Sequence, residues 1–240
     1  MLGLPELLEQ ARAWQARRLA VRLDAVPQAL YASLQEGLDA QGIALVSDEG
    51  LVRQLRCRKD EAEIALLRQA AAINDAAFTY ILPHLQPGAT ERELAEKIRR
   101  CMWEHGLESI NFLVVQSGPH SAMPHYYPTE RRLQQGDLVL LDWVPIYQGY
   151  ASDMTRTVVI GEPTAQQRAI YELVRQAQQA GLQAAVPGAT GHQVDAVARE
   201  IIVSGGYGEA YGHSLGHGIN EGPSLDIDSQ DVLAPGMVTT

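Results

Sequence analysis

The chain has little sulfur, and no apolar run in it is long enough to span a membrane. Its two cysteines, Cys57 and Cys101, lie far apart and outside any Cys-x-x-Cys pair. This argues against a disulfide framework and fits a reducing compartment. The first twenty residues carry charges at Glu6, Arg12 and Arg17, which exclude the apolar core of a signal peptide. We therefore expect a cytoplasmic protein that does not enter the membrane.

Positive charge is also scarce, because 19 lysines and arginines face 29 aspartates and glutamates, giving a formal net charge of −10. This balance argues against nucleic acid or an anionic membrane as the main partner, while leaving a cation site open. The chain is 46% hydrophobic and 20% charged, as is usual for a globular protein with a sizeable core.

The pattern of the first segment differs from that of the rest. Residues 1–57 alternate helical patterns with short apolar strands, as in a small α/β unit. A long amphipathic helical pattern then runs from about Asp60 to Leu82. We predict two domains, residues 1–57 and residues 58–240.

The larger predicted domain contains an internal repeat. Pro87-Gly88-Ala89-Thr90 recurs 100 positions later as Pro187-Gly188-Ala189-Thr190. Each copy follows a long helical pattern and precedes a second one that ends at glycine. Thr90 and Glu93 have the spacing of a capping box. We predict two duplicated halves related by a pseudo-twofold axis, and active sites often lie between such halves.

Two aspartates interrupt a predicted β-hairpin formed by the apolar runs 137–147 and 150–160. A two-residue loop at Tyr147-Gln148 places Asp142 directly opposite Asp153 on one face of the sheet. Like charges so placed destabilise a sheet, and a cation between them would remove the conflict. An ion pair with the nearby Arg156 would serve as well. The residues alone leave a metal site and a salt bridge equally open.

Two histidines follow in the segment Tyr211–Ile219, separated by three residues. No glutamate follows His213 and glycines surround His217, so this is not the HExxH motif of a zinc-binding helix. The glycines instead predict an extended segment in which the backbone comes close to another group. Histidines in such a segment are more often structural than ligands.

Taken together, these motifs resemble the pita-bread metallopeptidases. The matching features are Asp142, Asp153 within Ser-Asp-Met-Thr-Arg-Thr, and the run His213–Ile219. That group includes Xaa-Pro dipeptidase, aminopeptidase P and methionine aminopeptidase, with creatinase as a non-peptidase relative. The segment 118–125 resembles the stretch that brings a substrate-side histidine.

The resemblance implies an α+β pita-bread fold, with duplicated helix pairs packed on a curved antiparallel sheet. It covers the chain densely from about Lys59, whereas residues 1–57 resemble only a remnant of the family's N-terminal domain. It further implies a hydrolase that cleaves the bond before a proline in second position, with a hydroxide activated by two metal ions. A homodimer is an expectation from the resemblance only.

The resemblance also implies roles for individual residues. Asp142 would be a bidentate ligand of one metal, Asp153 would bridge two, and His217 would bind the other. His125 and His213 would contact substrate or stabilise the tetrahedral intermediate. Oxygen ligands with one imidazole suit manganese, cobalt, zinc or iron.

This sequence departs from the family pattern after His217. A short deletion is implied, with Asn220 where a catalytic histidine would stand. Two ligand glutamates expected after Val238 would lie beyond Thr240. We therefore expect the fold without its C-terminal strands, weak metal binding and little hydrolysis by this chain. A non-catalytic pita-bread binding protein and a creatinase-like amidinohydrolase remain the alternatives.

Overall fold

The computed structural model describes residues 3–23, 25–219 and 221–240, and the chain divides into two compact units, Met1–Arg56 and Cys57–Thr240. Within these described ranges, no helix is both long enough and apolar enough to cross a membrane.

The first unit is a small α/β arrangement. Its elements are α1 (Leu4–Ala13), β1 (Arg18–Val21), α2 (Gln28–Asp39), β2 (Ala44–Ser47) and most of α3 (Leu51–Cys57). The two strands pair in parallel. Ala11, Leu38 and Ile43 form its buried core. Its assignment as a remnant of an N-terminal creatinase-like domain stays a prediction.

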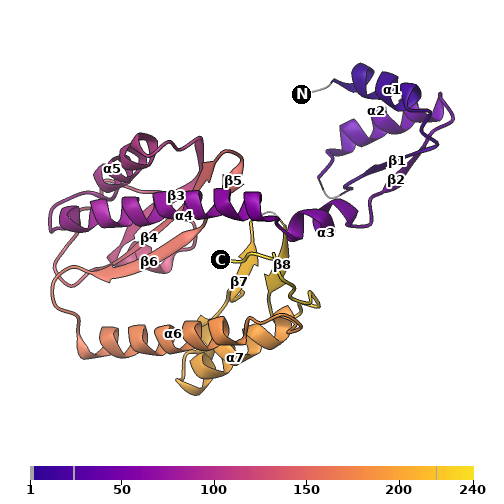
Figure 1. Cartoon of the computed structure of the whole chain (residues 1–240). Helices are drawn as coiled ribbons and strands as arrows, with labels where there is room; N and C mark the ends of the chain where they lie inside the picture. Colours follow the sequence, from indigo (N-terminus) through magenta and orange to yellow (C-terminus); the bar gives the residue numbers. More distant parts are fainter. Residues whose placement is uncertain (1–2, 24, 220) are drawn as a thin grey trace. The chain divides into compact units, whose positions relative to one another are not determined.

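The second unit begins with a helix pair that lies on an antiparallel sheet (Figure 1). Its elements are α4 (Glu61–Ile81), the 3₁₀ helix η1 (Leu82–His84), α5 (Glu91–Glu104), β3 (Ser109–Ser117), the 3₁₀ helix η2 (Gly118–Ala122), β4 (Leu138–Tyr147), β5 (Tyr150–Ala151) and β6 (Met154–Val159). Strand β4 is central, because it pairs with β3 along one edge and with β5 and β6 along the other.

The two faces of β4 carry different side chains, as the two-residue period of a strand requires. Val139, Leu141 and Trp143 are fully buried and belong to the main core. They pack with buried residues of the helices, including Ile73 of α4 and Ile98 of α5. Burial of each such large side chain stabilises the fold by roughly 1.5–3 kcal/mol. The residues that alternate with them, including Asp142, belong to the other face of the sheet.

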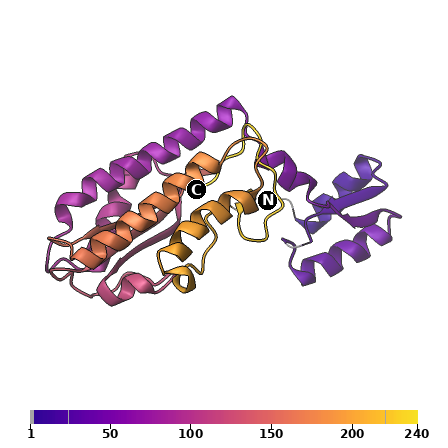
Figure 2. The ribbon, with the colours of Figure 1, turned by 90° about the horizontal axis from the view of Figure 1, so that it is seen from below.

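A second helix pair follows, formed by α6 (Ala165–Ala184) and α7 (Gly191–Ser204), which lie alongside each other in both views (Figures 1 and 2). The 3₁₀ helix η3 (Gly208–Ala210) and the short antiparallel pair β7 (Gly216–Gly218) and β8 (Glu221–Leu225) come next. A buried ion pair between Lys59 and Glu221 ties the segment before α4 to β8.

The predicted repeat is confirmed by matching backbone hydrogen bonds in the two halves. Gly88 donates to the carbonyl of Leu133 at 2.9 Å, and Gly188 donates to that of Leu233 at 2.8 Å. Gly88 and Gly188 share a φ of 93°, which favours glycine. The duplication therefore includes the returning segments around Leu133 and Leu233 as well as the helices.

The predicted register of the hairpin is wrong by two residues. Tyr147 pairs with Tyr150, so the loop is Gln148-Gly149, with φ angles of 47° and 82°. Two positive φ values are typical of a type I′ turn, which takes glycine readily at its second position. Asp142 consequently lies opposite Thr155. Because a shift of two residues preserves the face, Asp142 and Asp153 still belong to the same side of the sheet.

The capping boxes can be tested at the second copy of the repeat. The Thr190 hydroxyl accepts from the Gln193 amide at 3.2 Å, and the Gln193 side chain accepts from the Thr190 amide at 2.9 Å. We expect Thr190→Ala to remove about 1 kcal/mol of stability and to lower the Tm by roughly 2–4 °C. Gln193→Glu is the control, because Glu93 has this role in the first copy. Equal losses in both variants would contradict the assignment.

Candidate functional site

Asp142 lies in the middle of β4, between Val114 of β3 and Thr155 of β6. Burial raises the pKa of its carboxyl group above the usual range, and the Asp153 carboxylate raises it further. A hydrogen bond with the Thr155 side chain and the charges of His125 and His213 act in the opposite direction. The ionised carboxylate is thus held where the metal-free protein does not fully compensate its charge.

Asp153 lies in the break between β5 and β6. Burial raises the pKa of Asp153, while the charges of His217 and His213 lower it. Helix α4 holds Ser152, the residue before Asp153, because the side-chain amide of the buried Asn74 donates to the Ser152 hydroxyl at 3.1 Å. This contact fixes the chain at the point where the strand is interrupted.

The ion-pair alternative is not what the structure has. Arg156 pairs with Leu141 in the sheet. Its side chain therefore belongs to the face of the sheet opposite to that of Asp142. The Arg156 guanidinium donates to the carbonyl of Thr155 at 2.8 Å and lies 6.0 Å from the centre of the Phe78 ring. It therefore leaves Asp142 without the arginine partner that the sequence permitted.

His125 is exposed and follows η2, in the loop that connects β3 with β4. Its φ of 55° is left-handed, a conformation that is uncommon and costs free energy in residues other than glycine. Its ring meets the edge of Phe112 with 4.9 Å between the centres.

His213 and His217 lie in the extended segment that the glycines predicted, with 6.3 Å between their ring centres. The Nδ1 of His213 is 2.7 Å from the Ser214 carbonyl oxygen, and the Nδ1 of His217 is 3.2 Å from that of Gly218. Because a carbonyl oxygen can only accept, Nδ1 carries the proton in both rings. The neutral rings therefore keep their lone pair on Nε2, as a metal ligand or a base needs.

The charges of these residues act on one another across the two halves. Asp142 feels His125 from the first half and His213 from the second, and Asp153 feels His213 and His217. Even so, no three His, Cys, Asp or Glu side chains come close enough to hold a metal ion in the part of the chain that the structure describes. Asn220 lies outside the described residues.

The chemistry of the donors fits a divalent cation. Two partly buried carboxylates on one face, both with raised pKa values, are the kind of unfavourable pair that a cation stabilises. The imidazole of His217 adds a nitrogen donor with the required tautomer. Asp142, Asp153 and His217 are accordingly the residues that could hold a metal.

Sequence reasoning missed a buried ion pair beside the second histidine segment. Asp195 of α7 is 0% exposed and receives two hydrogen bonds from Arg199, at 2.6 and 3.0 Å. Asp195 also accepts from the Leu215 amide at 3.1 Å, and Arg199 donates to the carbonyls of Tyr211 and His213. The spacing of four residues between Asp195 and Arg199 was a visible signal.

A second missed residue is Glu91, which is 0% exposed at the start of α5. It shares the buried stripe of that helix with Leu94, Ala95 and Ile98. A carboxylate on an otherwise apolar stripe was the signal that could have found it.

The comparisons with known proteins agree with this arrangement. The model of metallopeptidase family M24 matches residues 65–240. The chain belongs to this family. Over 197 residues it is 38% identical to the Xaa-Pro dipeptidase of Pyrococcus horikoshii, an alignment that covers 80% of this chain and 56% of that protein.

Solved structures show that this M24 chain has the pita-bread fold. The Xaa-Pro dipeptidase of Bacillus anthracis superposes with a TM-score of 0.91 at 37% identity, covering 100% of this chain and 68% of that one. Prolidase from Pyrococcus furiosus gives 0.89 at 33% identity, covering 100% and 71%. The chain spans between 54% and 62% of the length of the curated relatives it matches.

The raised pKa of Asp142 gives a test in the metal-free M24 chain. A carboxyl group with a raised folded-state pKa contributes stability at low pH and loses it as the pH rises. We expect Asp142→Asn to raise the Tm at pH 7 in EDTA by about 2–4 °C, as ~1 kcal/mol would. The gain should shrink below pH 4, where the wild-type carboxyl is protonated.

The control for this substitution is Asp137→Asn. Burial opposes ionisation of Asp137, but the hydrogen bonds from Arg131 and from the Gln134 amide, together with the charge of Arg131, outweigh burial and lower its pKa. We expect this variant to lose stability at pH 7. A lower Tm for Asp142→Asn at pH 7 would refute our account of the site.

The Asp195–Arg199 pair can be tested by removing its cation. Arg199→Met leaves a fully buried carboxylate uncompensated, and we expect a loss of about 3 kcal/mol in urea unfolding. Arg175→Met is the matched control, because its bonds with Glu172 lie on the exposed face of α6. The prediction fails if the two variants lose similar stability.

Proposed function

We propose that this chain acts as a metal-dependent Xaa-Pro peptidase, which hydrolyses the peptide bond before a proline in second position. The observation that carries the proposal is the carboxylate pair Asp142 and Asp153, which senses charges from the histidines of both halves. Relatives at 38–40% identity are called Xaa-Pro dipeptidase, which supports the choice of substrate.

In this proposal Asp142, Asp153 and His217 hold two divalent ions, of manganese, cobalt, zinc or iron. Divalent cations would supply Lewis acidity, which polarises a carbonyl and lowers the pKa of water. Both carboxylates come from one sheet face in the first half, and His217 comes from β7 in the second, so the proposed ligands are drawn from both halves.

His125 and His213 are proposed to contact the substrate. Both residues are exposed within loops that buried side chains hold, and the Nε2 of His213 is free of a proton when the ring is neutral. When protonated, such a nitrogen can donate to an oxygen that gains negative charge during hydrolysis. The bond before proline has no N–H, so recognition has to depend on its carbonyl oxygen and the shape of the ring.

A non-catalytic binding protein remains a second candidate. One observation favours it, namely that no three potential ligands assemble among the described residues. The creatinase-like alternative has no comparable observation on its side.

Metal content and hydrolysis by one purified sample test the proposal. We expect the chain to bind manganese weakly, to cleave Ala-Pro slowly when loaded with it, and to leave Ala-Ala intact. His217→Ala should lower kcat/KM by about 100-fold or more, because it removes a ligand, together with metal content. His105→Ala, an exposed histidine at the end of α5, is the control.

Each other outcome has a clear meaning. Metal uptake without cleavage of Ala-Pro would refute the peptidase and favour an amidinohydrolase if creatine is consumed. Absence of both metal uptake and hydrolysis would favour the binding protein. Undiminished hydrolysis by His217→Ala would refute its role as a ligand.

A further inference from the structure

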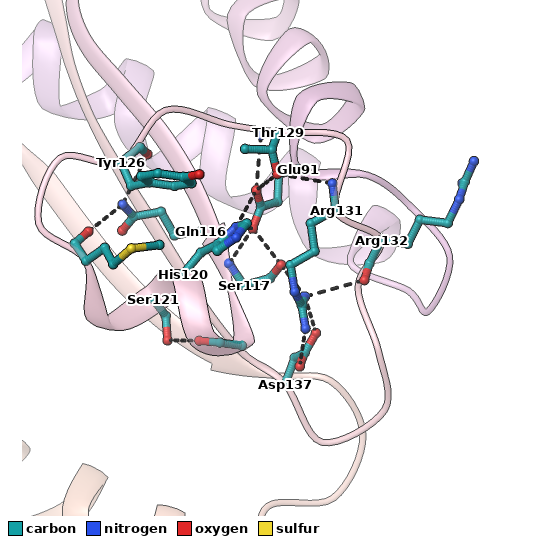
Figure 3. A network of polar contacts seen from close by, with 12 residues as sticks. Glu91, Gln116, Ser117, His120, Ser121, Tyr126, Thr129, Arg131, Arg132 and Asp137 are labelled. Atoms are coloured by element: carbon teal, nitrogen blue, oxygen red, sulfur yellow. Dashed lines mark hydrogen bonds and ion pairs between the residues drawn. The ribbon is translucent and has the colours of Figure 1, made fainter.

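The buried carboxylate of Glu91 is surrounded by donors from the segment that carries His125. The Ser117 amide and hydroxyl donate to Oε1 at 2.8 and 2.7 Å, and the Thr129 amide and hydroxyl donate to Oε2 at 3.1 and 2.7 Å. His120 Nδ1 lies 3.0 and 3.2 Å from the two oxygens. Figure 3 shows Ser117, His120 and Thr129 converging on this one group.

These contacts close the base of a loop. Ser117 ends β3 and Thr129 begins the return towards β4, so Glu91 joins the two ends of the stretch 118–128. The 1%-exposed Gln116 holds the middle, donating to the carbonyls of Met123 and Tyr126 at 2.7 and 3.1 Å. His125 lies between those two carbonyls in sequence.

The backbone of His125 needs this support. Its left-handed φ of 55° costs of order 1–3 kcal/mol in a residue other than glycine, and such a conformation persists only when the surroundings over-determine it. Within the described part of the chain the ring of His125 makes no hydrogen bond that would account for this conformation, but it packs edge-on against Phe112. The hydrogen bonds at Ser117, Met123, Tyr126 and Thr129 are the contacts that fix the backbone on both sides of it.

We propose that Glu91 is the positioning residue for His125, holding its loop in the strained conformation that directs the imidazole towards Asp142 and the substrate. This proposal deepens the proposed function and rests on it only for the existence of a substrate near His125. The ionised form suits the role: burial would raise the pKa of Glu91, but the hydrogen bonds from Thr129 and Ser117 outweigh burial and lower it.

Glutamine cannot replace this glutamate. Whichever way the amide is turned, its NH₂ group faces the amide of Ser117 or that of Thr129, and neither backbone N–H can turn away. Glu91→Gln therefore removes acceptors without changing size. Glu93→Gln is the matched control, made two residues away on the same helix at an exposed position, where Gln193 has the same capping role in the second half.

Two measurements on the metal-free chain test the proposal without any activity. In Glu91→Gln we expect amide hydrogens of residues 118–129 to exchange at least about tenfold faster, as a local opening free energy lower by ~1.4 kcal/mol would produce. In a ¹³C–¹H spectrum of the seven histidine rings, the signals of His120 and His125 should move while those of His213 and His217 stay. Glu93→Gln should change neither.

An unchanged His125 signal in folded Glu91→Gln would overturn the proposal, as would movement of all ring signals together. If Glu91→Gln does not fold, Thr129→Val decides, because it deletes one of the donors. The expected result is a smaller change at His125, and no change would overturn the proposal.

Kinetics add a readout that a purely structural role would not move. In manganese-loaded protein, Glu91→Gln should lower kcat on Ala-Pro at unchanged metal content, and adding it to His125→Ala should cause no further loss. Additive losses would overturn the proposal. If the wild type does not hydrolyse Ala-Pro, the peptidase function fails, while hydrogen exchange and the ring signals still decide the role of Glu91.

Discussion

The alternation of side chains along β4 is the constraint on which the rest of the molecule depends. One face must be apolar because both helices of the first pair pack on it, with Trp143 fully buried among them. The other face is then the only place where Asp142 can lie. Since Asp153 shares this face, the fold brings two partly buried carboxylates together at a cost in stability that a bound cation would offset.

Each half holds its histidine-bearing segment with a buried carboxylate, but at a different position of the repeat. Each second helix carries a buried stripe, and each stripe contains one carboxylate that holds a histidine-bearing segment: Glu91 in α5 and Asp195 in α7. Asp195 lies one turn further along its helix. The position equivalent to Glu91 is Gly191, where a Cβ would collide with the Ser224 carbonyl and the Ser229 hydroxyl. The carboxylate has therefore moved to where the second half leaves room for it.

The sequence predicted the repeat, the face shared by Asp142 and Asp153, and the family, because these depend on short spacings and on periods of two and 3.6 residues. The hairpin register was wrong because the loop was placed one residue too early, and Gly149 decides that point through its positive φ. The role of Glu91 could not be predicted in the same way. Its partners lie 26 and 38 positions away, and only the fold brings them together.

The strength of these anchors explains how exposed histidines can be held in fixed positions. Glu91 and the Asp195–Arg199 pair bind backbone and neighbouring side chains, and they leave the rings of His125 and His213 for other contacts. Holding a loop through its backbone orders it before any ligand arrives, so less entropy is lost on binding. The cost is one fully buried carboxylate in each half, Glu91 and Asp195, and two partly buried ones at the sheet face, and each is tolerable only with its own donors or a cation. Charge compensation, rather than apolar packing, is thus what couples the fold of this chain to its candidate site.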